Sequence, residues 1–238
     1  MKIIDVVQGS ADWLQARAGI VTASEMDNLI TPTGKVAAGK AVETYLYRKL
    51  AEKWIGGPLP TTYSGGGLEQ GHLKETDAIP WYELTYNRNI APIGFVTTDD
   101  GRVGCSPDGM FAHDGAEGAI LDGDGIEVKC PDLHTHIGYL LGGELPSAYM
   151  PQVQASMLVT GAPGWTFLSY CPKLPPLILV IERNEGVFET MCKALDAFCE
   201  RLDAGYARLV ELNKGEPTRP APATVAGDDD DGNTLDIL

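Results

Sequence analysis

Two carboxylates and a lysine stand where they could together hydrolyse a phosphodiester bond. Glu127 and Lys129 are two residues apart within a predicted strand over residues 125–130, and alternation along a strand places both side chains on one face. Asp108 follows another predicted strand, over residues 101–105. If these two strands are neighbours, the three side chains meet at one end of a sheet. Carboxylate oxygens bind Mg²⁺, which polarises a phosphoryl oxygen and lowers the pKa of bound water.

Lys129 would complete this chemistry. Its ammonium can orient or help deprotonate the attacking water, or neutralise the charge that develops at the phosphorus atom. The alternative is purely structural: Asp108 and Gly109 form an ordinary turn, and Glu127 and Lys129 are an exposed pair on a strand. Each feature is common by itself, and only their combination favours metal-assisted hydrolysis.

The elements that must position these residues follow from hydrophobic periodicity. A helix can begin at Thr22 or Ser24, because a side-chain oxygen there accepts from first-turn amides. Pro80 is expected to kink or end another helix, since proline has no amide hydrogen to donate. The alternation of helices and strands predicts an α/β (α+β) fold with a central mixed β-sheet flanked by helices. The predicted helices are 22–30, 36–55, 68–79, 148–160 and 185–212, and the predicted strands are 93–98, 101–105, 125–130, 165–170 and 177–181.

Length and composition bound the class of protein. The 238 residues are 44% hydrophobic and carry a net charge of −15, which indicates a globular domain with a substantial core. We expect this domain over residues 1–213 and a disordered acidic tail over residues 214–238, where prolines and a run of aspartates replace any periodicity. Apolar runs are too short for a membrane span. Asp5 and Asp12 come too early for a signal peptide, and five cysteines without close pairs suit a reducing cytoplasm.

The negative charge is uneven along the chain. A bulk-acidic surface repels phosphate, so net charge alone argues against nucleic acid. Residues 1–60, however, are close to neutral, and much of the acidic excess lies in residues 61–125 and in the tail. A metal ion bound by two carboxylates would also invert their local charge. The charge therefore predicts weak non-specific affinity for DNA instead of excluding it.

Five blocks of sequence extend the pattern well beyond three residues. They are Gln8–Ser24, which includes Trp13 and Arg17; Gly71 with Glu75; Gly104–Gly109; Glu127–Pro131; and Tyr149–Gln154 with Met157. In this order they resemble the motifs of the lambda-type phage exonucleases, the YqaJ-like viral recombinase family of the PD-(D/E)XK nuclease superfamily. The resemblance spans roughly residues 8–160. It implies the restriction-endonuclease-like core of that superfamily.

The resemblance implies a metal-binding set. Asp108 and Glu127 would bind Mg²⁺ together with the backbone carbonyl of Val128, and Lys129 would be the catalytic lysine. Two ions are expected, with Mn²⁺ as a substitute. Glu75 resembles a further acidic residue near the metals; the alternative for it is a solvated helix face.

The last motif implies supporting residues on a helix. Gln152 matches a glutamine of the family's active site. Tyr149, three residues earlier, shares its helix face and is expected to pack against the site. Gln154 is also expected to support the site, and this expectation rests only on its place in the motif.

The family degrades one strand of double-stranded DNA from a 5′ end and favours a 5′ phosphate. Arg17, Ser24 and Ser106 match its terminal-phosphate pocket, and their chemistry suits it, because a guanidinium grips phosphate bidentately and hydroxyls donate to it. We therefore expect a Mg²⁺-dependent 5′→3′ exonuclease that leaves 3′ single-stranded overhangs for phage-type recombination. Two other functions stay open: another nuclease of this fold, such as an endonuclease or a single-strand exonuclease, and a non-enzymatic acidic DNA mimic or scaffold.

The resemblance also implies partners. Besides double-stranded DNA ends, these are a single-strand annealing protein and two further copies of the chain in a homotrimeric ring. The tail over residues 226–238 has the composition of an acidic docking peptide for the annealing protein, and a solubilising end is the alternative. No membrane partner is expected.

Other reactive residue types are interpreted as structural. His134 and His136 lack a third ligand, so we expect them in a loop. The five cysteines are expected in the core, because iron–sulfur ligation needs four clustered thiolates. Residues 113–125, rich in Gly and Asp, are expected to form an extended hairpin loop with solvent-facing charge.

Overall fold

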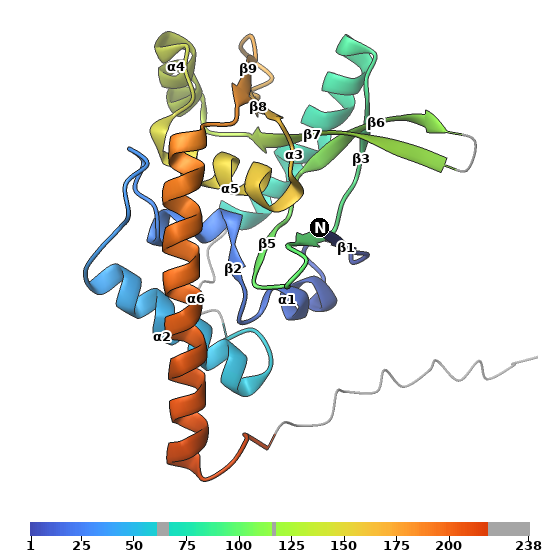
Figure 1. Ribbon diagram of the computed structural model, residues 1–238. Helices are drawn as coiled ribbons and strands as arrows, with labels where there is room; N and C mark the ends of the chain where they lie inside the picture. The colour runs from blue at the N-terminus through green and yellow to red at the C-terminus, as the bar shows by residue number, and fades with distance from the viewer. Residues whose placement is uncertain (61–66, 116–117, 219–238) are drawn as a thin grey trace, which may run out of the picture.

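The computed structural model describes the backbone of residues 1–60, 67–115 and 118–218, and within these ranges the side chains except those of 67–76, 114 and 118–120. Helices and strands alternate along the chain (Figure 1). The helices are α1 (Ala11–Arg17), α2 (Lys40–Ile55), α3 (Gly67–Tyr86), α4 (Leu133–Gly142), α5 (Met150–Thr160) and α6 (Glu185–Asn213), with the 3₁₀-helices η1 (Ala23–Asn28) and η2 (Ser147–Tyr149). The strands are β1 (Lys2–Ile4), β2 (Val21–Thr22), β3 (Asn89–Ala91), β4 (Phe95–Thr97), β5 (Val103–Cys105), β6 (Gly109–Gly115), β7 (Gly118–Lys129), β8 (Gly164–Ser169) and β9 (Leu177–Glu182).

The described strands form two sheets. The smaller sheet has the order β1-β4-β5-β2, and the larger has the order β3-β6-β7-β8-β9. Strand β7 runs antiparallel to β6 and parallel to β8, so the larger sheet is mixed. The predicted mixed sheet flanked by helices is therefore confirmed. The second sheet was not predicted: two of its strands, β4 and β5, correspond to the predicted strands 93–98 and 101–105, but β1 and β2 are only three and two residues long and were missed.

Helix α5 lies between the two sheets. It packs against β4 and β5 of the smaller sheet, against β7 and β8 of the larger one, and against α6. Accordingly Val153, Ala155 and Met157 are fully buried. In Figure 1 the long helix α6 runs along one side of the molecule with α2 packed against it. This packing holds the first turn of α5, which carries Gln152, against β7.

Two predicted helices begin differently from expectation. The helix expected over residues 22–30 is the short 3₁₀-helix η1, and the side chain of Thr22 does not cap it. Instead, the Thr22 hydroxyl donates to the carboxylate of Glu25. Helix α2 begins at Lys40, after Gly39 adopts a φ of +93° that a side chain would strain.

Pro80 was expected to kink or end its helix, and the second of these alternatives is wrong. Helix α3 continues through Pro80 to Tyr86. Proline removes one backbone hydrogen bond, but Ala78 and Tyr82 on either side of it are buried in a cluster with Phe111 of β6. This apolar packing stabilises the helix across the proline.

Helix α4 was missed, and with it the setting of two histidines. His134 and His136 lie in α4 and not in a loop. His136 is fully buried, with Nδ1 2.8 Å from Ser169 Oγ and Nε2 2.9 Å from the carbonyl of Pro175. Because a carbonyl only accepts, Nε2 carries a hydrogen and donates to Pro175, while Nδ1 lies within hydrogen-bond distance of Ser169 Oγ. His136 therefore ties α4 to the end of β8, which is a structural role.

Two further expectations need correction. The expected loop over residues 113–125 is largely strand, because β6 and β7 pair as far as Gly115 and Gly118. Among the cysteines, Cys105, Cys171 and Cys199 are buried and Cys130 is partly buried, but Cys192 is exposed on α6.

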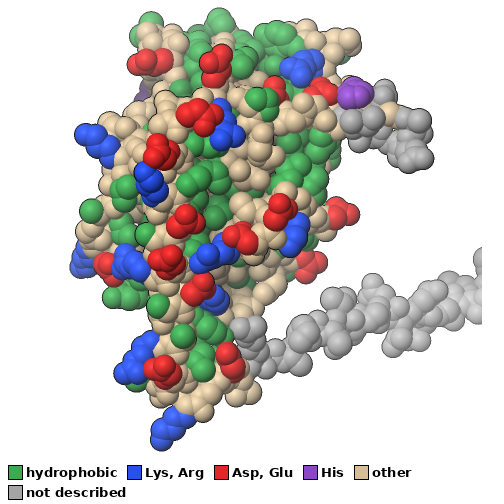
Figure 2. Space-filling view, in the orientation of Figure 1, with side chains coloured by type: hydrophobic (Ala, Val, Ile, Leu, Met, Phe, Trp, Pro, Cys, Tyr) green, Lys and Arg blue, Asp and Glu red, His purple; other side chains and the backbone are tan. Residues whose placement is uncertain are grey.

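Only the first residues of the predicted C-terminal tail are described. Residues 214–218 follow α6, and residues 219–238, which include most of the predicted tail, lie outside the described residues. In the described part of the chain, no helix has the length and apolarity to cross a membrane. On the face shown in Figure 2, acidic and basic side chains are intermixed, so no broad patch of one sign dominates it.

Gly125→Ala should destabilise the strand that carries Glu127. A Cβ atom at Gly125 would lie 2.3 Å from the ring of Trp165, which is fully buried on β8. Such overpacking costs about 1–3 kcal/mol, and we expect that loss in the free energy of unfolding measured with urea. Gly138→Ala in α4 is the control, because nothing lies within 4 Å of its added Cβ; equal stability of the two variants would contradict the packing.

Candidate active site

Glu127 and Lys129 do lie on one face of β7, as alternation predicts. The ammonium of Lys129 is paired with Oε1 of Glu127, which also accepts a 2.6 Å hydrogen bond from Nε2 of Gln152. Glu127 is only 2% exposed, whereas the side chain of Lys129 is 26% exposed. Among the described residues, this buried carboxylate thus accepts from Lys129 of its own strand and from Gln152 of α5.

Lys129 lies in an acidic and aromatic environment. Its Nζ is 5.5 Å from the centre of the Tyr149 ring, which itself packs against Phe167. Burial by itself lowers the pKa of Lys129, but the carboxylates of Glu127 and Asp108 outweigh it and raise the pKa well above its ordinary value. Lys129 is therefore a cation in this arrangement. Burial also raises the pKa of Tyr149 to about 12, so its hydroxyl is neutral.

Asp108 reaches the same place from the neighbouring strand, but that strand is β6 and not the predicted 101–105. The last β6–β7 pair is Gly109 with Ile126, so beyond it β7 has no β6 partner. In place of a β6 carbonyl, Asp108 Oδ2 accepts the amide hydrogen of Val128 at 2.6 Å. In a strand, the N–H and C=O of one residue point to the same edge. The carbonyl of Val128 therefore points to the same edge of β7 as its amide, which is the edge on which Asp108 lies.

These donors suit a hard divalent cation. Two carboxylates and one backbone carbonyl are the oxygen ligands that Mg²⁺ takes from proteins, with water in its remaining positions. Within the described residues, no group of three or more His, Cys, Asp or Glu side chains could hold a metal. A site here would thus depend on Asp108, Glu127 and the carbonyl of Val128, which is the predicted set. The side chain of Glu75 lies outside the described part of the structure.

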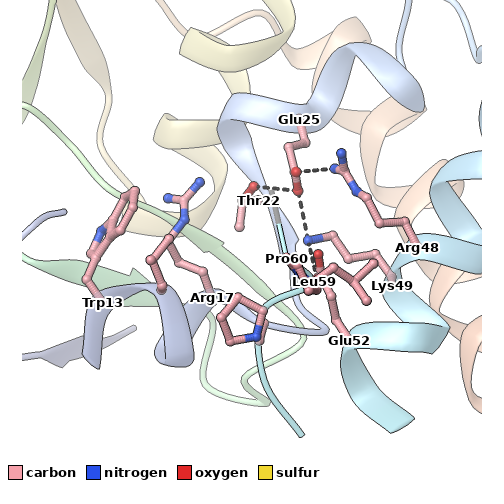
Figure 3. Close-up of a pocket in the computed structure, with 12 residues that line it drawn as sticks. Trp13, Arg17, Thr22, Glu25, Arg48, Lys49, Glu52, Leu59 and Pro60 are labelled. Carbon is pink, nitrogen blue, oxygen red and sulfur yellow. Dashed lines mark hydrogen bonds and ion pairs between the residues drawn. The ribbon is translucent and has the colours of Figure 1, made fainter. Parts of the chain in front are cut away.

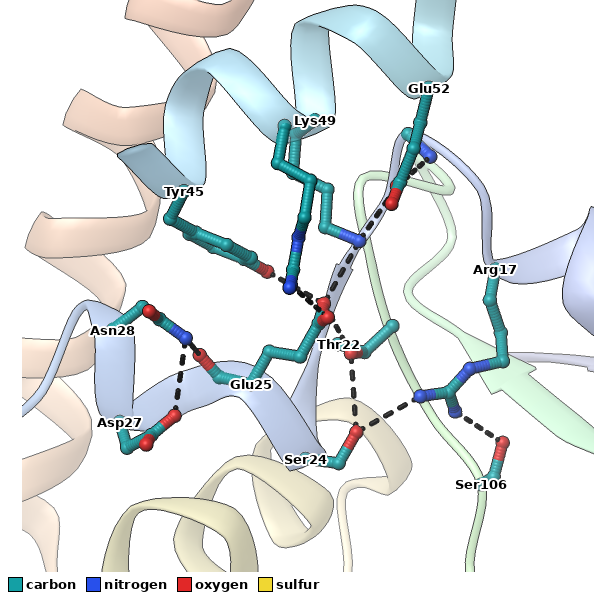
Figure 4. Close-up of polar contacts among 12 residues, drawn as sticks. Arg17, Thr22, Ser24, Glu25, Asp27, Asn28, Tyr45, Lys49, Glu52 and Ser106 are labelled. Carbon is teal, nitrogen blue, oxygen red and sulfur yellow. Dashed lines mark hydrogen bonds and ion pairs between the residues drawn. The ribbon is translucent and has the colours of Figure 1, made fainter. Parts of the chain in front are cut away.

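Arg17, Ser24 and Ser106 are brought together, as predicted, although they come from three separate segments. Arg17 donates from Nη1 to Ser106 Oγ at 2.9 Å and from Nη2 to Ser24 Oγ at 3.0 Å (Figure 4). Burial lowers the pKa of the guanidinium, while Glu25 opposes the change. One planar cation and two hydroxyls are thus hydrogen-bonded to one another, and these are group types that bind phosphate.

Trp13 orients this group. Its indole Nε1 donates to Ser106 Oγ at 2.8 Å, and its ring lies 4.2 Å from the guanidinium carbon of Arg17. Ser106 Oγ thus accepts two N–H hydrogen bonds, which occupy both of its lone pairs and leave its own hydrogen to donate. The pocket therefore offers a hydroxyl donor beside a stacked guanidinium, as an anion requires.

A charged network connects the pocket to α2. Glu25 accepts from Thr22 at 3.0 Å and from Tyr45 at 3.2 Å, and it pairs with Arg48 and Lys49 (Figure 4). Burial alone raises the pKa of Glu25, but Lys49 and Arg48 outweigh it, so its pKa lies below the ordinary value. Since Thr22 donates to Glu25, the 3.4 Å contact between Thr22 and Ser24 has Ser24 as the donor. Through Thr22, the network fixes the hydroxyl of Ser24 beside Arg17.

A pocket of about 490 Å³ opens beside Arg17 (Figure 3). Its walls come from α1, from β2 and η1, from α2, and from the segment after α2. Glu52, on the α2 wall, pairs with Lys49 at 2.9 Å. The lining residues are Trp13, Leu14, Arg17, Ala18, Thr22, Glu25, Arg48, Lys49, Glu52, Pro58, Leu59 and Pro60.

Gln154 is hydrogen-bonded neither to the carboxylates and lysine near β7 nor to the group around Arg17. It donates to the carbonyl of Glu182 at 2.9 Å and accepts from the amide of Asn184. These contacts lie at the end of β9, because a shift of two residues on a helix turns the side chain away from the face of Gln152. The expectation that Gln154 supports the site is therefore wrong, and its role is to hold the β9–α6 junction.

Sequence reasoning missed several contributors. Trp13 and Arg17 are four residues apart on α1 and so share a helix face, a spacing that could have paired them. Lys49 and Glu52 are three apart on α2 in the same way. Gln8 was named only as part of a motif, and nothing local indicated its partners, which are 85 and 99 residues away.

The sequence model of the YqaJ-like viral recombinase domain matches residues 12–163, more than half of the chain. This chain belongs to the YqaJ-like viral recombinase family. The match includes Arg17 and the segments that contribute Asp108, Glu127, Lys129 and Gln152. A curated protein of Escherichia coli (strain K12), the uncharacterised ExoD, is 38% identical over 76 residues, which are 30% of this chain and 87% of that protein.

Solved structures share the fold of this YqaJ-like protein. LHK-Exo in complex with dAMP has a TM-score of 0.73 at 24% identity, covering 86% of this chain and 98% of that one. The alkaline exonuclease LHK-Exo from Laribacter hongkongensis gives the same TM-score and coverage at 23% identity. A phage-related exonuclease from Haemophilus somnus 129PT has a TM-score of 0.57 at 13% identity, covering 80% of this chain and 96% of that one. The exonuclease fold of the prediction is thus confirmed.

Proposed function

We propose that this YqaJ-like protein is a Mg²⁺-dependent 5′→3′ exonuclease that degrades one strand of double-stranded DNA from 5′-phosphorylated ends. Its product would be the 3′ single-stranded overhang that phage-type recombination uses. We call Arg17, Ser24 and Ser106 the anion pocket, and Asp108, Glu127 and Lys129 the carboxylate–lysine site. One observation carries the proposal: Ser106 of the first group and Asp108 of the second belong to one segment and are two residues apart. A 5′ phosphate and a phosphodiester close to it would therefore reach both groups together.

The carboxylate–lysine site supports the hydrolytic step. Mg²⁺ held by Asp108, Glu127 and the Val128 carbonyl, as one ion or as one of a pair, with Mn²⁺ as a substitute, would polarise the scissile phosphate and acidify water. Lys129 then orients that water and stabilises the negative charge that develops on the phosphoryl oxygens. Gln152 fixes Glu127 by donating to Oε1.

The anion pocket supports the choice of end. Arg17 lies over the ring of Trp13 and donates in the plane of its guanidinium. Ser106 has a hydroxyl hydrogen left to donate, and Ser24 would redirect its hydrogen from Thr22 to the phosphate. Two residues of chain span at most about 7 Å, which is comparable with the spacing of consecutive phosphates in one DNA strand. A terminal phosphate at Arg17 would thus set the first phosphodiester near Asp108.

The wider assembly is also proposed from the family resemblance. A homotrimeric ring around the duplex would keep the protein on DNA, which the surface charge of an acidic protein does not do. The single-strand annealing partner would bind residues 226–238, which lie outside the described residues. The site of action would be the cytoplasm of a bacterial host.

Digestion of linear and covalently closed circular duplex tests this proposal. With Mg²⁺ we expect the linear DNA to be degraded and the circle to stay intact, and EDTA should stop the reaction because the carboxylates then lack their ion. Cutting of the circle would instead favour an endonuclease of the same fold. Absence of cleavage with either Mg²⁺ or Mn²⁺ would favour the DNA mimic or scaffold.

A further inference from the structure

Gln8 makes two hydrogen bonds to distant parts of the chain although its side chain is exposed. Its Nε2 donates to the carbonyl of Ile93 at 2.8 Å and to the carbonyl of Pro107 at 2.7 Å. A side-chain amide nitrogen has two hydrogens, and both are used here. Carbonyls only accept, so these partners also fix which way the amide faces. An exposed glutamine would lose little by pointing into water, which makes this double contact notable.

The backbone around Gln8 is held against the same region. Gly94, next to Ile93, approaches the chain so closely that an added Cβ would lie 2.0 Å from the carbonyl oxygen of Val6. After Gln8, Gly9 turns the chain toward α1 with a φ of +84°, a conformation that favours glycine. Gln8 is therefore presented to Ile93 and Pro107 from a fixed segment and not from a loose one.

Pro107 lies between the two candidate sites. On one side Ser106 is bound by Trp13 and Arg17, and on the other Asp108 is bound by the amide of Val128. The Gln8 contact holds the residue that joins them. We propose that Gln8 is a positioning residue that sets the distance between the 5′-phosphate pocket and the metal-binding carboxylates. This inference rests on the proposed function.

Loss of the contact should affect turnover more than binding. In Gln8→Leu the contacts of Arg17 with Ser24 and Ser106 remain, so a 5′ phosphate still binds. The bound end is no longer aligned with Asp108, and a misplacement of about 1 Å can cost on the order of 10²-fold in rate. A 5′-hydroxyl end is not anchored in the pocket and can adjust, so its rate falls less.

Steady-state kinetics on matched duplexes test the proposal. For Gln8→Leu we expect the ratio of kcat on 5′-phosphate ends to kcat on 5′-hydroxyl ends to fall about 10-fold or more, with KM for phosphorylated ends within about threefold. Gln8→Glu, of nearly the same size, should show the same fall in the kcat ratio. It replaces Gln8→Leu in this test if the leucine variant does not fold. Gln8→Lys, which restores a donor for both carbonyls, should recover most of the kcat ratio. Equal losses on both ends, or a loss confined to KM, would overturn the proposal.

Gln15→Leu is the matched control. Gln15 is also an exposed glutamine near the start of the chain, and it donates to the carbonyl of Gly56 at 2.6 Å, away from the segment 106–108. Its loss should leave the kcat ratio as in the parent protein.

Hydrogen exchange separates this inference from the proposed function. The peptide over residues 104–110 should exchange faster in Gln8→Leu than in the parent protein and in Gln15→Leu, whatever the activity. Unchanged exchange would overturn the positioning role. Faster exchange in a protein whose parent shows no preference for 5′ phosphate would instead count against the proposed function.

Discussion

Lys129→Ala should lower the rate of DNA hydrolysis about 10³-fold while the protein stays folded. The change removes the ammonium of Lys129 that pairs with Glu127, and thereby the group placed to orient water and stabilise charge at phosphorus. The side chain is partly exposed, so its loss opens no large cavity. Glu127 keeps the hydrogen bond from Gln152 and is not left without a donor.

Single-turnover cleavage of a linear duplex measures this effect, with circular dichroism as the test of folding. Lys193→Ala is the matched control, because Lys193 also pairs with a glutamate, Glu189, but is 73% exposed on α6. The control should cleave at the parent rate. A folded Lys129→Ala protein that cleaves within tenfold of the parent would show that the chemistry lies elsewhere.

Arg17→Ala should remove most of the preference for 5′-phosphorylated ends. Hydrogen bonds to charged groups contribute about 1.5–3 kcal/mol each, so the preference in kcat/KM should fall on the order of 10- to 100-fold. The loss should appear mainly in KM, because Arg17 binds the end and does not contact the carboxylate–lysine site. This distinguishes it from the loss in kcat expected for Gln8→Leu.

Competition between 5′-phosphate and 5′-hydroxyl duplexes measures the preference directly. Arg17→Lys should recover only part of it, since an ammonium keeps the charge but not the planar pair of donors. Arg201→Ala, which removes an exposed arginine paired with Glu43, should leave it unchanged. A preference that survives in Arg17→Ala would show that the end is recognised by other residues.

That Asp108, Glu127 and Lys129 lie together could be predicted from the sequence because the cues are local. Glu127 and Lys129 share a face through strand alternation alone, and Asp108 immediately precedes the neighbouring strand β6. The partner strand was assigned wrongly, however: the 101–105 segment belongs to the smaller sheet, and β6 pairs with β7. Short strands carry too little periodicity to show which sheet they join.

The contacts that were missed are long-range or depend on burial. Gln152 and Gln154 stand in the same motif, and only the packing of α5 shows that Gln152 faces Glu127 while Gln154 faces β9. Pro80 was expected to interrupt a helix that tertiary packing sustains. Local propensity cannot weigh such packing, because the partners come from distant segments.

The acidity of the chain is also clearer in the structure. Part of the negative charge is already paired: Glu25 with Arg48 and Lys49, and Asp203 with Lys53 and Arg102. Such carboxylates do not contribute fully to a repulsive field. The net charge therefore says less about DNA than the local arrangement around Arg17 and Lys129 does.

The direction of degradation tests the central proposal most directly. A linear duplex whose strands carry distinguishable labels at the 5′ and 3′ ends is incubated with the protein and Mg²⁺, and the release of each label is followed in time. The proposal predicts that the 5′ label of a phosphorylated strand is released first, that the 3′ end persists in a single-stranded overhang, and that EDTA prevents both. Release of the 3′ label first would contradict it.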